Sequence, residues 1–316
     1  MNMYAARLAF RCPQNFRAYT QGGLSRNVLR RRTGAQAQTL KEPSANLKTP
    51  FSIGQGAVAG ASVIGIGALA FYGLGLSNEP GTLEKSVAWP SYVQERIQST
   101  FGYFGASLGV SALAATGVFR SPQLMGFVSG GGLLSLGVSM AAMIGSGYMM
   151  RSISYQESKG AKHLAWLAHS SILGACVAPI CLLGGPLLLR AAMYTGGMLS
   201  ALSIVSVTAP SEKFLYMGGP LAMGLGVVFA SSIGSFFLPP TSLLGASLYS
   251  MSLYGGLILF GGFVLYDTQK IIYRAEHTPK YVGWDPINAS SGIYLDTLNI
   301  FMRIAQILAM NGGNKR

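Results

Sequence analysis

The chain has 316 residues, of which half are apolar and only 10% are charged, and its formal net charge is +13. An ordinary soluble domain carries about 25% charged residues, so this composition excludes a soluble globule. The high hydrophobicity excludes a disordered chain, and the 42 glycines follow no strict triplet, which excludes collagen. The remaining class is an all-α polytopic membrane protein, in which each crossing takes about 20 residues.

The first part of the chain, residues 1–50, has the composition of a mitochondrial transit peptide and basic tail. Residues 1–41 hold eight basic residues and no acidic one. The arginines are mixed with apolar, Ser, Thr and Gln residues, and an apolar core of about 7–15 residues, as in a secretory signal, is absent. The alternative is a basic tail that lies beside anionic lipid. Because this tail holds much of the positive charge, no basic folded face for nucleic acid is indicated.

Apolar runs follow the tail in close succession. They lie at about 53–76, 100–119, 124–150, 164–184, 187–209, 214–238, 243–267 and 287–310. The first seven carry almost no internal charge, whereas the last contains Asp296, Asn299, Arg303 and Gln306. A span with such residues is sheltered from lipid when other helices surround it. The pattern therefore predicts a helix bundle with the last helix inside.

Two of the three aspartates lie in apolar helices. Asp267 closes the seventh run and Asp296 lies inside the eighth, whereas Asp285 lies in a polar loop and is expected to be solvated. A charged side chain at the centre of a membrane helix costs about 2.5–3.5 kcal/mol on insertion scales. Packing does not require such residues, so we expect Asp267 and Asp296 to have a function.

The two aspartates are expected to meet, because residues 268–286 connect their helices and favour an antiparallel pairing. Two carboxyl groups in contact at membrane depth share one proton. A hard divalent cation can replace that proton, with Asn299, Thr297 and backbone carbonyls as further oxygen ligands. The alternative is a buried hydrogen-bonded pair that only fixes helix packing.

Two arginines are candidates for an electrostatic role. Arg120 ends the second run, where it either reaches a carboxylate or extends to the membrane interface. Arg303 follows Asp296 by seven residues on the same helical face, where it either neutralises that face or acts as a gate. No Ser/His/Asp or Cys/His set indicates hydrolysis, so the sequence predicts no enzyme and no cofactor.

Several separated motifs resemble those of one family. Leu265–Gln269 and Ile293–Phe301 resemble the C-terminal signature of the Bax inhibitor-1 (TMBIM) family. His163–Trp166, Gly184–Pro186 and Ala209–Phe214 are similar to a mitochondrial member of that family. The similarity runs from about residue 50 to the C-terminus, and its motifs occur in order.

The resemblance implies a bundle of seven helices with the last one central, formed by residues 99–316. The run within residues 51–98 is then an extra N-terminal transmembrane helix with its connection. The resemblance also implies that Asp267 and Asp296 form a pH-sensing pair that gates a calcium leak, and that Arg120 lies at the position of a latch arginine. The mitochondrial member is associated with the inner membrane, cristae organisation, cytochrome c retention and calcium/proton exchange.

These features lead to a first hypothesis of a pH-sensitive calcium pathway, either a calcium/proton exchanger or a leak channel, in the mitochondrial inner membrane. Asp267, Asp296 and Arg120 would sense pH and gate the pathway, and Asp267, Asp296 and Asn299 would bind the ion. Calcium is here the transported ion. The expected partners are membrane lipid, calcium, protons, cytochrome c and inner-membrane protease or transporter complexes, without nucleic acid.

Two alternatives remain open. Glycines four apart, such as Gly56/Gly60 and Gly105/Gly109, allow close helix contact in lipid. They favour a non-transporting scaffold that organises cristae and inner-membrane complexes by lateral contacts. The weaker alternative is an intramembrane enzyme, in which the two aspartates activate water as in aspartyl proteases.

Overall fold

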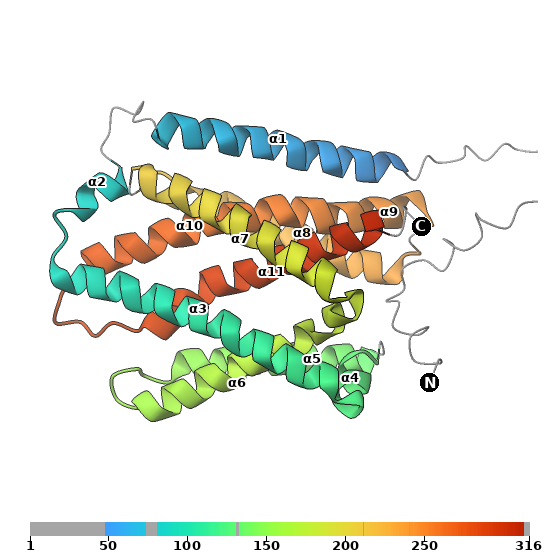
Figure 1. Cartoon of the computed structure of the whole chain (residues 1–316), viewed down its shortest axis with the longest axis horizontal. Coiled ribbons are helices and arrows are strands. Elements are labelled where there is room, and N and C mark those ends of the chain that lie inside the picture. The colour runs from blue at the N-terminus through green and yellow to red at the C-terminus, as the bar shows by residue number, and fades with distance from the viewer. Residues whose placement is uncertain (1–47, 74–80, 131–132, 211, 240, 313–316) are drawn as a thin grey trace, which may run out of the picture.

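The computed structural model describes residues 48–73, 81–130, 133–210, 212–239 and 241–312, all in helices and their connections (Figure 1). The transit peptide expected in residues 1–50 lies almost entirely outside these ranges. The long helices are α1 (Lys48–Gly73), α3 (Ser91–Arg120), α5 (Leu133–Ser152), α6 (Lys159–Val177), α7 (Gly185–Thr208), α8 (Gly218–Phe237), α10 (Gly256–His277) and α11 (Pro286–Gly312). The shorter elements are α2 (Thr82–Ser86), α4 (Pro122–Val128), η2 (Ala178–Leu183), η3 (Leu215–Met217), α9 (Leu243–Ser250) and the π-helical turn η4 (Met251–Gly255).

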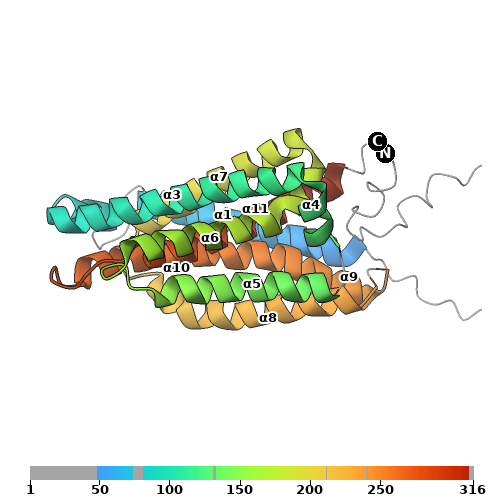
Figure 2. The ribbon, with the colours of Figure 1, turned by 90° about the horizontal axis from the view of Figure 1, so that it is seen from below.

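The protein is a multi-pass helical membrane bundle. Within the described ranges, seven helical segments are long and apolar enough to cross a membrane: Thr49–Tyr72, Ser91–Arg120, Lys159–Leu183, Gly185–Thr208, Leu215–Phe237, Leu243–His277 and Pro286–Asn311. Helix α5 adds a further 20-residue helix that packs on α6. The long helices run roughly along one common direction (Figure 2). The predicted all-α fold is confirmed.

One predicted helix is divided in the structure. The apolar run at 124–150 predicts a single helix, but α4 ends at Val128 and α5 begins at Leu133. Ser129 is followed by three glycines in the sequence. Glycine is a poor helix former because its backbone loses the most conformational freedom on folding. The serine and glycine that follow Val128 therefore lie outside both helices, despite the apolar character of the sequence on either side.

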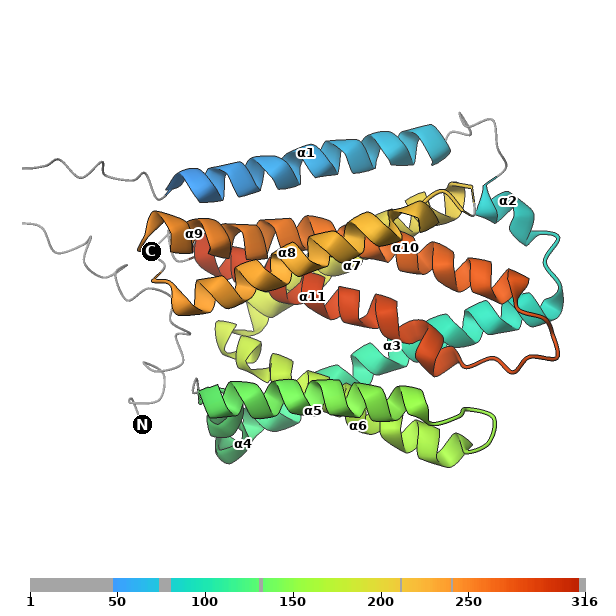
Figure 3. The ribbon, with the colours of Figure 1, turned by 180° about the vertical axis from the view of Figure 1, so that it is seen from behind.

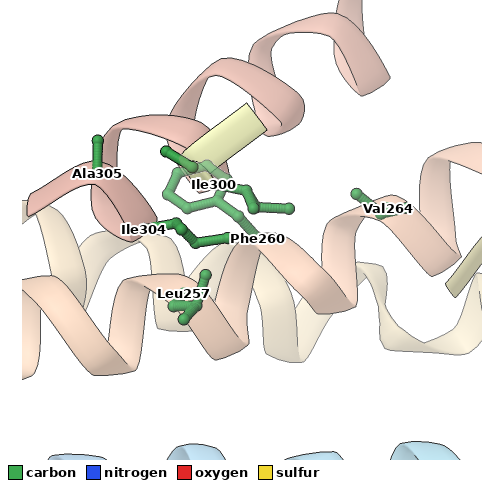
Figure 4. Close-up of a cluster of buried hydrophobic side chains, with 7 residues drawn as sticks. Leu257, Phe260, Val264, Ile300, Ile304 and Ala305 are labelled. Carbon is green, nitrogen blue, oxygen red and sulfur yellow. The ribbon is translucent and has the colours of Figure 1, made fainter. Parts of the chain in front are cut away.

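The centre of the bundle is formed by the last two helices. Half of the membrane-spanning window that includes α10 is buried, as is 44% of the window in α11, compared with at most 33% in the other spans. Helix α11 packs against α3, α7 and α10, and Figure 3 shows it between α10 and the layer of α3 and α5. Between α10, α11 and α7 the buried core consists of Leu257, Phe260, Val264, Ile300, Ile304, Ala305 and Ala191 (Figure 4). The predicted central position of the last helix is confirmed, with α10 buried beside it.

The extra N-terminal helix α1 lies on the outside of the bundle, along α7 and α9 (Figure 3). Its first half is attached by polar contacts: Ser250 Oγ donates to Pro50 O at 2.7 Å, and Gln55 Nε2 donates to Tyr254 OH at 3.4 Å. Gly54 leaves room for the Tyr254 ring, because a Cβ at this position would overlap it. The remaining surface of α1 is largely exposed, as expected of a helix that faces lipid.

Helices α3 and α6 approach closely and position α11. A Cβ on Gly174 of α6 would overlap the backbone of Ser111 in α3, so glycine permits this contact. The Ser111 hydroxyl donates to Ser170 O at 2.9 Å and also forms a hydrogen bond with the hydroxyl of Tyr294 in α11. The side chain of Ser111 therefore ties three helices together near the middle of α11.

Candidate functional site

The structure brings together the two aspartates that the sequence places in apolar helices. The carboxyl groups of Asp267 in α10 and Asp296 in α11 lie within hydrogen-bonding reach of each other. Asp296 is only 5% exposed and the Asp267 side chain 14% exposed. Two carboxyl groups so close together in a low dielectric hold a shared proton or require a cation between them.

A glycine makes this contact possible. Gly292 lies one turn before Asp296 on α11, and the Asp267 carboxyl group packs directly on it. A Cβ at residue 292 would overlap Asp267 Oδ2. The absence of a side chain at Gly292 therefore lets Asp267 reach the face of α11 that carries Asp296.

Three cations act on the Asp267 side of the pair. Lys270 Nζ lies 3.9 Å from Asp267 Oδ1 within the same helix. Arg274 and Arg151 also act on this carboxyl group electrostatically, and Arg151 Nη2 donates to Ser291 Oγ at 3.3 Å. The pair therefore has an asymmetric environment, in which cations stabilise a negative charge on Asp267 more than on Asp296.

One carboxyl oxygen of the pair has no hydrogen-bond partner. Asp296 Oδ2 is buried without a partner among the described residues, as is Thr268 Oγ1 beside Asp267. Buried polar atoms are usually hydrogen-bonded, so an unpartnered carboxyl oxygen indicates a place for a proton or an ion. No group of three or more His, Cys, Asp or Glu residues in the described ranges could hold a metal ion. Asp267 and Asp296 are thus a pair of carboxyl groups without a third such ligand in the described ranges.

The structure does not bring the other two candidate site residues to the pair. Asn299 Oδ1 accepts from Arg303 Nη1 at 2.9 Å, and Asn299 Nδ2 donates to Leu295 O at 2.9 Å. Arg120 is the last residue of α3 and is exposed. Among the residues placed in the structure, no hydrogen bond or ion pair joins Arg120 to either aspartate.

A fully buried lysine, whose role no sequence motif indicates, holds the start of α11. Lys162 Nζ lies 2.8 Å from Asp285 Oδ2 and donates to Asn288 Oδ1, Met150 O and Ile153 O at 2.7–3.0 Å. Asp285 also accepts from the backbone of Asn288 at 3.0 Å, as an N-cap does. The expectation that Asp285 is solvated is wrong, since its side chain is 24% exposed and ion-paired. The sequence does carry a signal for the N-cap role of Asp285, because this acid directly precedes Pro286, and proline is common at the first position of a helix.

A buried arginine holds the connection between α10 and α11. Arg96 of α3 is 6% exposed and donates to four carbonyl groups, those of Ala275, Thr278, Pro279 and Val282, at 2.6–3.1 Å. The aromatic rings of Tyr92 and Trp284 lie 5.0 and 5.4 Å from its guanidinium carbon. The last carbonyls of a helix have no partner within that helix. Arg96 binds the carbonyls at the end of α10 and in the following loop, so it fixes α10 relative to α3.

Four polar residues and one glycine of α11 lie on one face of the helix, which we call the polar stripe. Its members are Asn288, Gly292, Asp296, Asn299 and Arg303. Residues three or four apart lie on one face of a helix. The stripe contacts Lys162 at its first residue, Asp267 in its middle and the π-helical turn η4 at its last residue. It is a row of polar groups along a helix that lies at the centre of the bundle.

Comparisons with known proteins agree with this architecture. The model of the family described as Inhibitor of apoptosis-promoting Bax1 matches residues 93–313. The chain is 54% identical over 295 residues to Growth hormone-inducible transmembrane protein of Rattus norvegicus, covering 91% of this chain and 85% of that protein. It is 30% identical over 228 residues to Bax inhibitor 1 of Homo sapiens, covering 71% of this chain and 89% of that protein. No solved structure matches. The chain therefore belongs to the Bax inhibitor-1 family, a family of membrane proteins related to the regulation of apoptosis.

Proposed function

We propose that the protein is a pH-sensitive calcium pathway of the mitochondrial inner membrane, either a calcium/proton exchanger or a leak channel. The observation that carries this proposal is the buried contact between Asp267 and Asp296, with one Asp296 oxygen unpartnered. Carboxylate oxygens are preferred ligands of calcium. When the shared proton leaves, the two carboxylates bind a calcium ion in its place.

The two states of the pair differ in what they do to the helices. With one shared proton, the carboxyl groups form a hydrogen bond that joins α10 to α11. Without it, two negative charges repel each other unless a cation lies between them. An alkaline matrix favours the second state and so opens the site to calcium. Asn299 joins the ligands only after it leaves Arg303, and the role of Arg120 as a latch stays a prediction.

The proposed location and partners rest on the tail and on the family. The basic, acid-free composition of residues 1–41 favours import into mitochondria. We propose roles in cristae organisation and apoptosis control, with cytochrome c and inner-membrane protease or transporter complexes as partners beside lipid, calcium and protons. We propose no enzymatic activity and no cofactor.

Replacing either aspartate by asparagine tests the proposal. Asp267→Asn and Asp296→Asn each replace one carboxyl group by a neutral amide, so the two side chains can no longer share a titrating proton. We therefore expect calcium flux to lose its dependence on pH. The measurement is calcium entry into proteoliposomes of purified protein over a pH series around neutrality. Glu157→Gln is the matched control, because Glu157 is exposed and lies outside the site. Uphill calcium movement against an imposed proton gradient would identify an exchanger, whereas downhill movement alone would identify a leak.

The scaffold remains the second candidate function, and one observation favours it. Gly56 and Gly60 lie on α1 with no neighbouring atom within 4 Å of a Cβ built on either residue. Such an open small-residue face suits contact with another membrane helix. Unchanged flux and an unchanged pH response in both asparagine variants would contradict the calcium pathway. Rescue of cristae shape by both variants in a knockout, with flux at background, would support the scaffold.

A further inference from the structure

The polar stripe ends at a partly buried guanidinium group that contacts η4 and α10. Arg303 Nε donates to Ser252 O at 3.1 Å, and Nη1 donates to the backbone and side-chain oxygens of Asn299 at 3.1 and 2.9 Å. The guanidinium carbon lies 4.6 Å from the centre of the Phe260 ring. Three oxygen atoms and the face of one aromatic ring thus lie against this charge.

Arg303 has no carboxylate partner in the part of the chain that the structure describes. The ion pairs found there are Lys162–Asp285 and Lys270–Asp267, and neither includes Arg303. Arginine keeps its charge in proteins, and dipoles stabilise a charge without cancelling it. A net positive charge therefore remains, partly buried, at the end of the stripe opposite Lys162.

The surroundings are shaped to hold this group. A Cβ on Gly256 would overlap the guanidinium, so the glycine at the start of α10 provides its space. The carbonyl that accepts from Arg303 Nε belongs to the π-helical turn η4, a rare conformation that is frequent at functional sites. Ser252 Oγ is in turn 2.7 Å from Ser232 Oγ of α8. Arg303 is therefore fixed by contacts that link α8, η4, α10 and α11.

We infer that Arg303 is the element that limits cation passage through the half of the bundle beyond Asp296. This inference rests on the proposed calcium pathway and names the residue that sets its rate and selectivity. Seven residues separate Asp296 from Arg303 on one face of α11, which is about 10 Å along the helix axis. A cation that leaves the aspartate pair in this direction meets a fixed charge that no carboxylate neutralises. Because Coulomb energy scales with the charge of the ion, Arg303 opposes calcium more strongly than potassium.

The experiment compares two replacements of Arg303 in proteoliposomes loaded with a calcium or a potassium indicator. Arg303→Met removes the charge and keeps an unbranched side chain, and we expect it to raise calcium flux by about tenfold or more, since the repulsion at about 10 Å is large in a protein interior. Potassium flux should rise by a smaller factor. Arg303→Lys keeps the charge but not the forked hydrogen bonds, and we expect calcium flux within about twofold of wild type.

Gel filtration and thermal unfolding in detergent check that each variant is folded. If Arg303→Met does not fold, Arg303→Gln replaces it, because its amide keeps a donor for the Ser252 carbonyl. Equal increases in the Met and Lys variants would overturn the inference, since loosened packing would then explain both. Unchanged flux and selectivity in the neutral variant would overturn it as well.

The same experiment separates this inference from the proposed function. If Asp267→Asn alters calcium flux and Arg303→Met does not, only the inference about Arg303 is contradicted. If neither asparagine variant alters calcium flux, the aspartate-gated pathway is contradicted. A rise in calcium flux in Arg303→Met would in that case still support the inference that Arg303 limits cation passage. If wild type and Arg303→Met both carry no calcium, both proposals are wrong.

Discussion

Replacing Gly292 by alanine is expected to abolish most of the pH response of calcium flux while the bundle still folds. The new Cβ would occupy the position of the Asp267 carboxyl group, which lies directly on this glycine. The Asp267 side chain must then turn away, and its contact with Asp296 is lost. A displacement of about 1 Å in a functional site can cost about 100-fold in rate, so we expect the pH-dependent flux to fall by about tenfold or more. The measurement is calcium entry into proteoliposomes across a pH series.

Gly105 of α3 provides the matched control for this substitution. No atom lies within 4 Å of a Cβ built on Gly105. Gly105→Ala therefore adds the same methyl group to a helix without a collision, and the change raises helix stability by about 0.5–1 kcal/mol. We expect its flux and pH response to match wild type. A wild-type pH response in Gly292→Ala would show that the close contact between the two aspartates is not required.

Replacing Lys162 by methionine is expected to be the most destabilising of the substitutions considered for this chain. The ammonium group is fully buried, 2.8 Å from Asp285 Oδ2, and donates to three further oxygens. Removing one partner of a buried ion pair leaves the other charge uncompensated and costs about 3–5 kcal/mol. We expect a free energy of unfolding lower by this amount, measured by denaturant unfolding in detergent micelles. The start of α11 would lose its attachment to α6 at the same time.

The exposed Lys159, three residues earlier in α6, is the control for this loss. Lys159→Met removes the same charge from the surface and should leave the free energy of unfolding close to that of wild type. Adding Asp285→Asn to Lys162→Met should recover part of the loss, because the uncompensated carboxylate is then removed. Equal stability of the Lys162→Met protein and wild type would show that the buried ion pair does not hold α11.

The helix positions and the meeting of the two aspartates could be predicted from the sequence because the membrane imposes them. A bilayer fixes the length and the apolar character of each span, so α1, α3, α7, α8 and α11 lie where the apolar runs indicate. A carboxylate in such a span is costly enough to stand out. Asp267 and Asp296 lie on consecutive helices joined by residues 268–286, so the sequence favours an antiparallel pairing of these helices.

The contacts that depend on distant neighbours could not be predicted. Lys162 lies near the start of an apolar helix, where a lysine is usually solvated, and only the fold places Asp285 against it. Arg96 lies in the first turns of α3 and reaches carbonyls about 180 residues away in sequence. The side chain of Asn299 bonds to Arg303 rather than to the aspartates, a choice that depends on rotamers and not on helical spacing.

The grip of Arg96 on the end of α10 has a mechanical consequence for the whole hairpin of α10 and α11. Together with Lys162, it anchors the base of the hairpin at the loop that joins the two helices. At the other end of α11, Arg303 is held against Ser252 of η4 and Phe260 of α10. The aspartate pair therefore lies between two attachment points of the hairpin. Loss of the shared proton thus acts on the middle of the hairpin, where, of these three contacts, only that between the carboxyl groups joins the two helices.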